Sequence, residues 1–68
     1  MKTIIQFNGQ PREVASGTTV AALLAQLNLR PAHVGVEINL ELVPRGQHGQ
    51  HVLREGDCVE VVTLVGGG

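Results

Sequence analysis

The amino-acid sequence predicts an α+β fold in which one helix packs against one face of a single mixed β-sheet. Residues 19–28 carry apolar side chains at helical spacing, whereas residues 2–7 and 58–65 are rich in β-branched residues. A chain of 68 residues has room for one hydrophobic core. The helix and the strands must therefore share that core in a two-layer arrangement.

The first two strands are expected to form a hairpin. Lys2–Phe7 has the composition of a strand, with alternate residues on one face. Asn8-Gly9 then favours a type I′ turn, because both residues tolerate positive φ. We expect the chain to return antiparallel over about Gln10–Val14. Pro11 has no amide hydrogen and should lie where the sheet needs no donor.

A helix is predicted from about Thr19 to Asn28. Its apolar residues fall at positions i, i+3, i+4 and i+7, which lie on one helical face. This stripe consists of Val20, Leu23, Leu24 and Leu27. The hydroxyl of Thr18 or Thr19 is placed to cap the first turn, and Pro31 should stop the helix. The acidic residue of a capping box is absent, because alanine stands in its place.

Three further strands are expected. Val34–Leu40 alternates apolar with polar residues, and a tight turn should lead into a short strand at Glu41–Pro44. Arg45–His51 is polar and contains glycine, as in a loop or a single 3₁₀ turn. Arg54–Asp57 is a glycine-containing turn that precedes the last strand, Cys58–Val65.

The inner faces of these elements define one expected core. It consists of Ile5, Phe7, Val20, Leu23, Leu27, Val36, Ile38, Leu53, Val59 and Val61. Val62 and Leu64 alternate with the core positions of the last strand and should face outward. Residues 1–65 thus form one expected domain. Gly66–Gly68 is expected to be a flexible tail, because glycine has no side chain to anchor it.

Composition argues against several classes of function. The formal net charge is -1, without a basic stripe or a row of aromatic residues, so nucleic-acid binding is not expected. No apolar run is long enough to span a membrane. Cys58 has no partner for an internal disulfide, which suits a reducing cytoplasm. We expect a cytoplasmic protein that is monomeric when free.

The histidines and the cysteine offer only weak alternative sites. His48 and His51 are two loop histidines three residues apart, which with His33 and a single cysteine in the chain make only a weak site, so we expect solvated side chains rather than metal ligands. Cys58 begins a strand, where a free cysteine commonly acts as a small apolar residue. No activating charge is evident beside it. We therefore expect no bound metal and no catalytic cysteine.

Four segments, taken in order, resemble the ThiS/MoaD branch of the ubiquitin-like β-grasp superfamily. They are Phe7–Gly9, Thr19–Leu24, Ile38-Asn39 with Val43–Arg45, and Leu53–Glu60 followed by the last strand and the terminal glycines. The resemblance covers essentially the whole chain and implies the β-grasp fold. The short length and the Ile-Asn…Val-Pro-Arg segment favour the ThiS family, the sulfur carriers for the thiamine thiazole. A molybdopterin-type sulfur carrier is the nearest alternative, although such carriers usually have a longer chain.

The resemblance implies that the reactive group is the carboxylate of Gly68. A ThiF-like activating enzyme would use ATP to adenylate it, and sulfur from a donor such as a cysteine desulfurase would then displace AMP. The resulting thiocarboxylate would pass its sulfur to thiazole synthase. Gly66 and Gly67, without side chains, can thread a narrow channel into the active sites of these partners. The chain would then be no enzyme and would hold no cofactor.

Other interpretations remain open from the sequence. Val62, Leu64 and Arg45 are candidates for a surface that partners hold, although an exposed arginine equally serves to solvate a loop. A ubiquitin-like modifier, which is conjugated to lysines, uses the same kind of tail. A β-grasp binding module with a fortuitous glycine tail is a third interpretation, since glycine-rich termini are often linkers.

Overall fold

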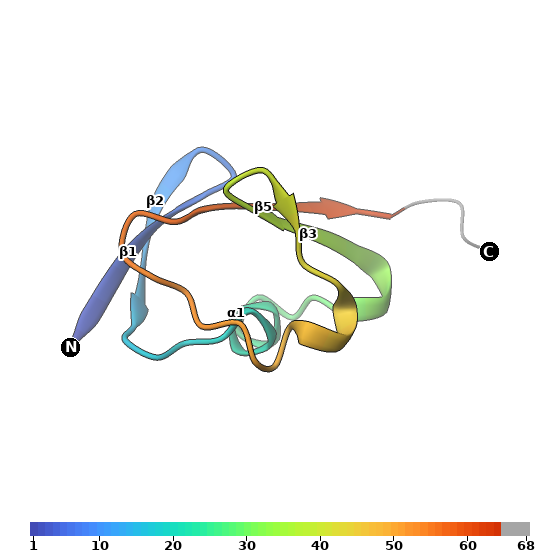
Figure 1. The fold of residues 1–68 in the computed structure, drawn as a ribbon, viewed down its shortest axis with the longest axis horizontal. Helices are drawn as coiled ribbons and strands as arrows, with labels where there is room; N and C mark the ends of the chain where they lie inside the picture. Colours follow the sequence, from blue (N-terminus) through green and yellow to red (C-terminus); the bar gives the residue numbers. More distant parts are fainter. Residues whose placement is uncertain (65–68) are drawn as a thin grey trace.

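The computed structural model describes residues 1–64, which form a five-stranded sheet with one α-helix packed beneath it (Figure 1). The elements are β1 (Lys2–Phe7), β2 (Gln10–Ala15), α1 (Val20–Gln26), β3 (Val34–Ile38), β4 (Glu41–Leu42) and β5 (Cys58–Thr63). The strand order is β2-β1-β5-β3-β4, so the last strand of the chain lies at the centre. Only the β1–β5 pairing is parallel within this sheet. The expected α+β arrangement and the mixed sheet are confirmed.

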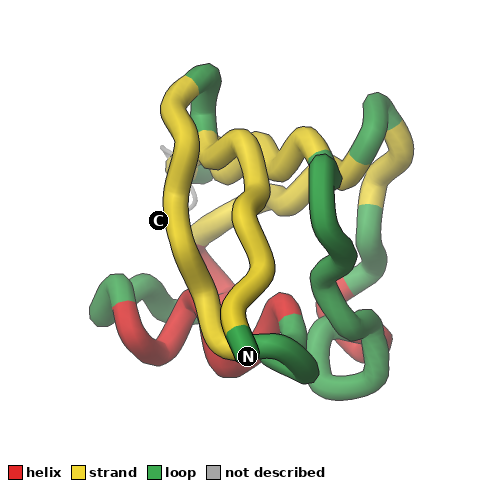
Figure 2. The backbone as a smooth tube through the Cα atoms, turned by 90° about the vertical axis from the view of Figure 1, so that its left-hand side faces the viewer, coloured by secondary structure: helices red, strands yellow, loops and turns green. Residues whose placement is uncertain are grey.

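The β1–β2 hairpin forms as the sequence predicts (Figure 2). Asn8 and Gly9 have φ of 49° and 84°, the two positive values of a type I′ turn. The turn sets the register, in which Phe7 lies opposite Gln10. Pro11 lies in β2, an edge strand, where a missing amide hydrogen leaves no gap in the sheet's inner ladders.

Three acceptors satisfy the N-terminal amides of α1 without an acidic capping residue. The Thr19 hydroxyl accepts from the amide of Ala22 at 3.1 Å, which confirms Thr19 as the N-cap. The carbonyl oxygens of His51 and His48 accept from the first and second helical residues at 2.9 and 3.0 Å. The loop after β4 thus supplies the acceptors that a capping box would have provided.

The helix ends at Gln26, two residues earlier than predicted. Asn28 adopts a left-handed φ of 58°, and its amide donates to the carbonyl of Ala25. The amide of Leu29 donates to the carbonyl of Leu24 at 2.9 Å. These two bonds form a Schellman motif, which closes the helix before Pro31 can. A 3₁₀ turn, η1 (Pro31–His33), then leads into β3 and was not predicted.

The later strands are shorter than predicted. β3 ends at Ile38, because Asn39 and Leu40 have φ of 54° and 71° and form a two-residue turn. β4 ends at Leu42, and Pro44 precedes a 3₁₀ turn, η2 (Arg45–Gln47), in the segment predicted to be a loop or such a turn. β5 ends at Thr63.

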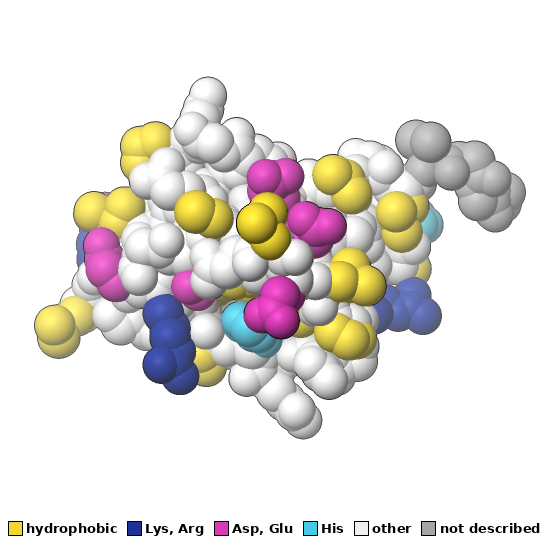
Figure 3. Space-filling model, turned by 45° about the horizontal axis from the view of Figure 1, so that its top comes forward, with side chains coloured by type: hydrophobic (Ala, Val, Ile, Leu, Met, Phe, Trp, Pro, Cys, Tyr) yellow, Lys and Arg dark blue, Asp and Glu magenta, His cyan; other side chains and the backbone are white. Residues whose placement is uncertain are grey.

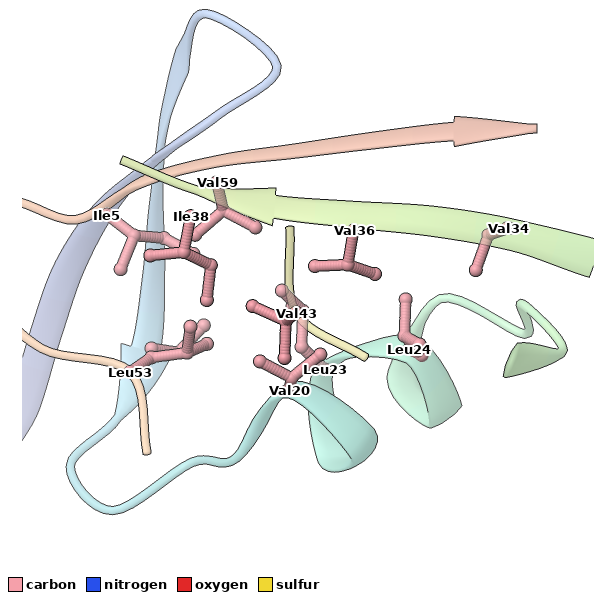
Figure 4. Close-up of a cluster of buried hydrophobic side chains, with 11 residues drawn as sticks. Ile5, Val20, Leu23, Leu24, Val34, Val36, Ile38, Val43, Leu53 and Val59 are labelled. Carbon is pink, nitrogen blue, oxygen red and sulfur yellow. The ribbon is translucent and has the colours of Figure 1, made fainter. Parts of the chain in front are cut away.

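The core lies between α1 and the inner face of the sheet (Figure 4). Its buried members are Ile5, Val14, Val20, Leu23, Leu24, Val34, Val36, Ile38, Val43, Leu53 and Val59. Phe7, Leu27 and Val61 were predicted inside it but are only partly buried at its margin. No described helix is long and apolar enough to cross a membrane.

Candidate functional site

β5 leads toward the terminal glycines, and the sheet holds it firmly on its β3 side. The antiparallel pairing with β3 runs from Ile38 opposite Val59 to Val34 opposite Thr63. One residue later, the amide of Leu64 donates to the carbonyl of His33 at 2.8 Å. Residues 65–68 lie outside the described residues, so the predicted flexible tail and the role of Gly66–Gly68 stay predictions. The described chain nevertheless fixes the point from which they begin.

On its β1 side, β5 is held by the side chain of Asn8. Strand pairing on this side ends where Phe7 lies opposite Val59. Beyond it, the amide of Val61 donates to the Asn8 side-chain oxygen at 2.8 Å, and the Asn8 side-chain nitrogen donates to the Val61 carbonyl at 3.3 Å. The Asn8 side chain therefore takes the place of the next backbone pairing between β1 and β5. The sequence did not predict this role for Asn8.

Asn39, in the β3–β4 turn, does the same at the start of β5. Its backbone amide donates to the carbonyl of Cys58 at 2.8 Å, and its side-chain oxygen accepts from the amide of Cys58 at 3.0 Å. Its side-chain nitrogen donates to an oxygen of Asp57 at 3.1 Å. Two asparagines from two hairpin turns therefore clamp the central strand from opposite sides.

The outer face of the sheet, turned away from α1, carries the predicted partner residues Val62 and Leu64. Their exposed fractions are 56% and 57%, as their alternation with Val59 and Val61 requires. Gly35 lies opposite Val62, and a Cβ atom there would come within 3.5 Å of the Val62 Cγ2 atom. That distance is an ordinary van der Waals contact, so the Val62 side chain lies beside the Gly35 position of β3.

Next to Val62, the same face carries a row of residues that the sequence did not predict. Glu60 lies directly opposite Glu37, and Glu37 lies directly opposite Leu42. All three side chains are exposed. In the space-filling view, carboxylates and apolar side chains gather over the middle of the molecule, and Lys or Arg side chains show toward its sides (Figure 3). The part of this face that β5, β3 and β4 form is apolar and acidic.

Arg45 does not belong to this surface. It begins η2, which lies at the level of α1 below the sheet (Figure 1). The same loop bonds to the first turn of the helix through the His48 carbonyl. The structure therefore groups Val62 with Leu64 and places Arg45 in the other layer.

The expectation of solvated histidines is wrong for His48. Its side chain is only 4% exposed, and its Nε2 atom lies 3.0 Å from the carbonyl oxygen of Val43. His33 is exposed and His51 is half-buried. Within residues 1–64, no three potential metal-ligating side chains come together. His48 is thus part of the loop's packing.

Cys58 was expected to act as a small apolar residue at the start of a strand, but its side chain is not buried. Cys58 is exposed, because it precedes the buried Val59 and so falls on the outer face.

Two shallow depressions on the described surface are lined by residues between Gln47 and Arg54 and open widely to solvent. Neither resembles the enclosed, largely apolar site that holds a cofactor.

Comparison with known proteins agrees with this architecture. The model of the ThiS family matches residues 5–68. The chain is 41% identical over 64 residues to the sulfur carrier protein ThiS of Escherichia coli, in an alignment that covers 94% of this chain and 97% of that protein. The chain belongs to the ThiS family. The crystal structure of the thiamine biosynthesis protein ThiS from Geobacter metallireducens matches with a TM-score of 0.83 and 32% identity, over 97% of this chain and 100% of that one.

Two larger relatives contain a segment similar to this ThiS-family chain. A thiazole synthase of Magnetococcus marinus is 45% identical over 64 residues, and one of Paramagnetospirillum magneticum is 41% identical over 68 residues. The chain spans only 20% of the length of each of these proteins. The similarity therefore concerns a segment of each.

Proposed function

We propose that this chain is a sulfur carrier of thiamine biosynthesis and that its working group is the carboxylate of Gly68. The observation that carries the proposal is the ThiS-family match, which extends through that residue. The carrier named ThiS in Escherichia coli aligns along nearly its whole length and supports it. The role is that of a co-substrate, and the chain itself is no enzyme.

The proposed chemistry follows from the fact that a carboxylate has no good leaving group. Its oxygen is a poor leaving group, so it must first be activated. In the proposed cycle, a carboxylate oxygen of Gly68 attacks the α-phosphate of ATP on a ThiF-like enzyme, and pyrophosphate leaves. A persulfide sulfur from a donor such as a cysteine desulfurase then attacks the carbonyl carbon and expels AMP. This step forms a carbon–sulfur bond and gives an acyl disulfide. A thiol then attacks the donor's sulfur in that acyl disulfide, forms a disulfide with it and releases the thiocarboxylate.

Gly66 and Gly67 would carry this group into the partners' active sites. Without Cβ atoms they fit a narrow channel and adopt φ of either sign. Val62 and Leu64 lie a few residues before them on the outer face and are suited to contact the protein that surrounds the channel. We propose an activating enzyme, a sulfur donor and a thiazole synthase as partners. The carrier would act in the cytoplasm, without a bound cofactor and as a monomer when free.

The intact mass of the protein tests this function. After incubation with ATP, the activating enzyme and a sulfur source, we expect the mass to rise by the difference between one sulfur and one oxygen atom. Omission of ATP is the control and should leave the mass unchanged. Conjugates to lysine in place of the thiocarboxylate would instead favour a protein modifier. No change of any kind would favour a binding module and would refute the carrier.

A further inference from the structure

The chain makes the same turn twice, with a different residue at its second position. In the β1–β2 hairpin, Asn8-Gly9 has φ of 49° and 84°. In the β3–β4 hairpin, Asn39-Leu40 has φ of 54° and 71°. Glycine suits this left-handed conformation, whereas the Cβ atom of a leucine is crowded there. Leu40 therefore occupies a position where the backbone itself disfavours it.

Packing does not compensate for this strain. The Leu40 side chain is 88% exposed, so the core gains nothing from it. Leu42, two residues later in β4, is 69% exposed. A residue that is strained and also exposes a large apolar side chain calls for a role outside the fold. Contact with another molecule is such a role.

The charges beside these leucines indicate which kind of protein surface would cover them. Glu37 lies directly opposite Leu42, and Glu60 lies directly opposite Glu37. Like charges in such a pair destabilise a sheet, and a cation placed over them relieves their repulsion. Among the described residues the one ion pair joins Lys2 to Glu13, at 3.2 Å, so Glu37 and Glu60 have no cationic partner in that part of the chain. A complementary surface is apolar and carries Lys or Arg.

We propose that Leu40, Leu42, Glu37 and Glu60 form the docking surface for thiazole synthase. This rests on the proposed carrier function. Two proteins named thiazole synthase contain a segment similar to this chain. In each of them the carrier-like segment and the rest of the protein belong to one polypeptide. The surface is continuous with Val62, which follows Glu60 by two residues, or about 7 Å along β5. A synthase seated there reaches the start of the tail.

Replacing Leu40 by glycine separates the two roles of this residue. The Leu40→Gly variant should melt at a higher temperature than the wild type, because strain is relieved. Its Kd for the cognate thiazole synthase, measured by calorimetric titration of the full chain, should nevertheless rise at least about fivefold. Leu40→Asn tolerates the turn without an apolar side chain and should show the same loss, whereas Leu40→Met should retain affinity. An unchanged Kd for both Leu40→Gly and Leu40→Asn would overturn the proposal.

Charge reversal tests the acidic row. Glu60→Lys and Glu37→Lys should each weaken synthase binding about tenfold at low ionic strength, and the difference should shrink as salt is added. Val52→Thr is the matched control: Val52 is 44% exposed but pairs with Thr19 at the start of the helix. Its Kd should equal that of the wild type. An effect of Val52→Thr as large as that of Glu60→Lys would contradict the assigned surface.

Adenylation distinguishes this proposal from the carrier function. ATP–pyrophosphate exchange with the activating enzyme should proceed at the wild-type rate in Leu40→Gly. If exchange falls while synthase affinity is kept, the surface serves the activating enzyme and the proposal is refuted. The same holds if the wild type gains sulfur but does not bind the synthase. A wild type that never gains sulfur refutes the carrier function itself.

Discussion

Leu23 lies on the sheet-facing side of α1 and is completely buried, at 0% exposure, together with Ile5 and Val59 from neighbouring central strands (Figure 4). Phe7 has the larger side chain, yet it is only partly buried at the margin of the core. The guanidinium of Arg12 lies 5.9 Å from its ring centroid and covers part of it. Position in the core, more than side-chain size, therefore decides what each residue contributes.

Leu23→Ala should lower the free energy of unfolding by about 2–5 kcal/mol, because a cavity opens where no neighbour can easily collapse. Phe7→Ala should cost less than Leu23→Ala, since water already reaches part of the ring. Leu42→Ala is a control with an exposed side chain and should change stability little. Urea denaturation followed by circular dichroism measures all three variants. A larger loss for Phe7→Ala than for Leu23→Ala would show that the ring anchors the core.

For single residues, the sequence predicts on which face of a strand a side chain lies. It predicts less well which other parts of the chain surround that side chain. Val62 and Leu64 face outward because alternation along a strand is fixed by backbone geometry. The exposure of Cys58 follows from the same alternation, because it directly precedes the core residue Val59. His48, in contrast, is buried because the loop after β4 folds back onto the helix. That outcome depends on tertiary packing, which local composition does not encode.

The elements of the fold are predictable, whereas their ends are set by capping and turn residues. Thr19 caps α1 as expected, but Asn28 ends it early through a left-handed turn. Asn39 and Leu40 were predicted to end a strand but form a turn. The turn was missed because only Asn-Gly is a strong sequence signal for a type I′ turn. The acidic row of Glu37 and Glu60 likewise depends on the register of β3 against β5, which is decided only in the folded sheet.

The asparagine clamps lead to a prediction for β5. Asn8→Gly keeps the left-handed turn but removes the side chain that bonds to Val61. The Val61 amide should then exchange its hydrogen roughly fivefold faster, as expected for the loss of one net hydrogen bond. Asn39→Gly is the matched variant and should accelerate exchange at Cys58 instead. Equal exchange rates at Val61 in Asn8→Gly and the wild type would show that the clamp contributes nothing.

For the whole molecule, the position of β5 links the fold to the proposed function. The last strand is the central one, paired with β3 to Thr63 and clamped by Asn8 at Val61. Its inner side chains complete the core, and its outer side chains belong to an apolar and acidic face. One strand thus holds the domain together, presents a surface to partners and leads to the glycines.

This arrangement predicts that chemistry at Gly68 is separable from folding. One residue added after Gly68 should abolish gain of sulfur, because the carboxylate of Gly68 becomes an amide carbonyl without an oxygen for adenylation. Gly68→Ala keeps a carboxylate, so that variant should bind the activating enzyme but be adenylated slowly, since its Cβ atom restricts φ and crowds the attack path. The circular dichroism spectrum should be unchanged in both variants, because the buried core residues all lie between Ile5 and Val59, away from the altered C-terminus. Pyrophosphate exchange and intact mass measure the two steps separately. Sulfur found at Gly68 of the untrimmed, extended protein would contradict the carrier mechanism.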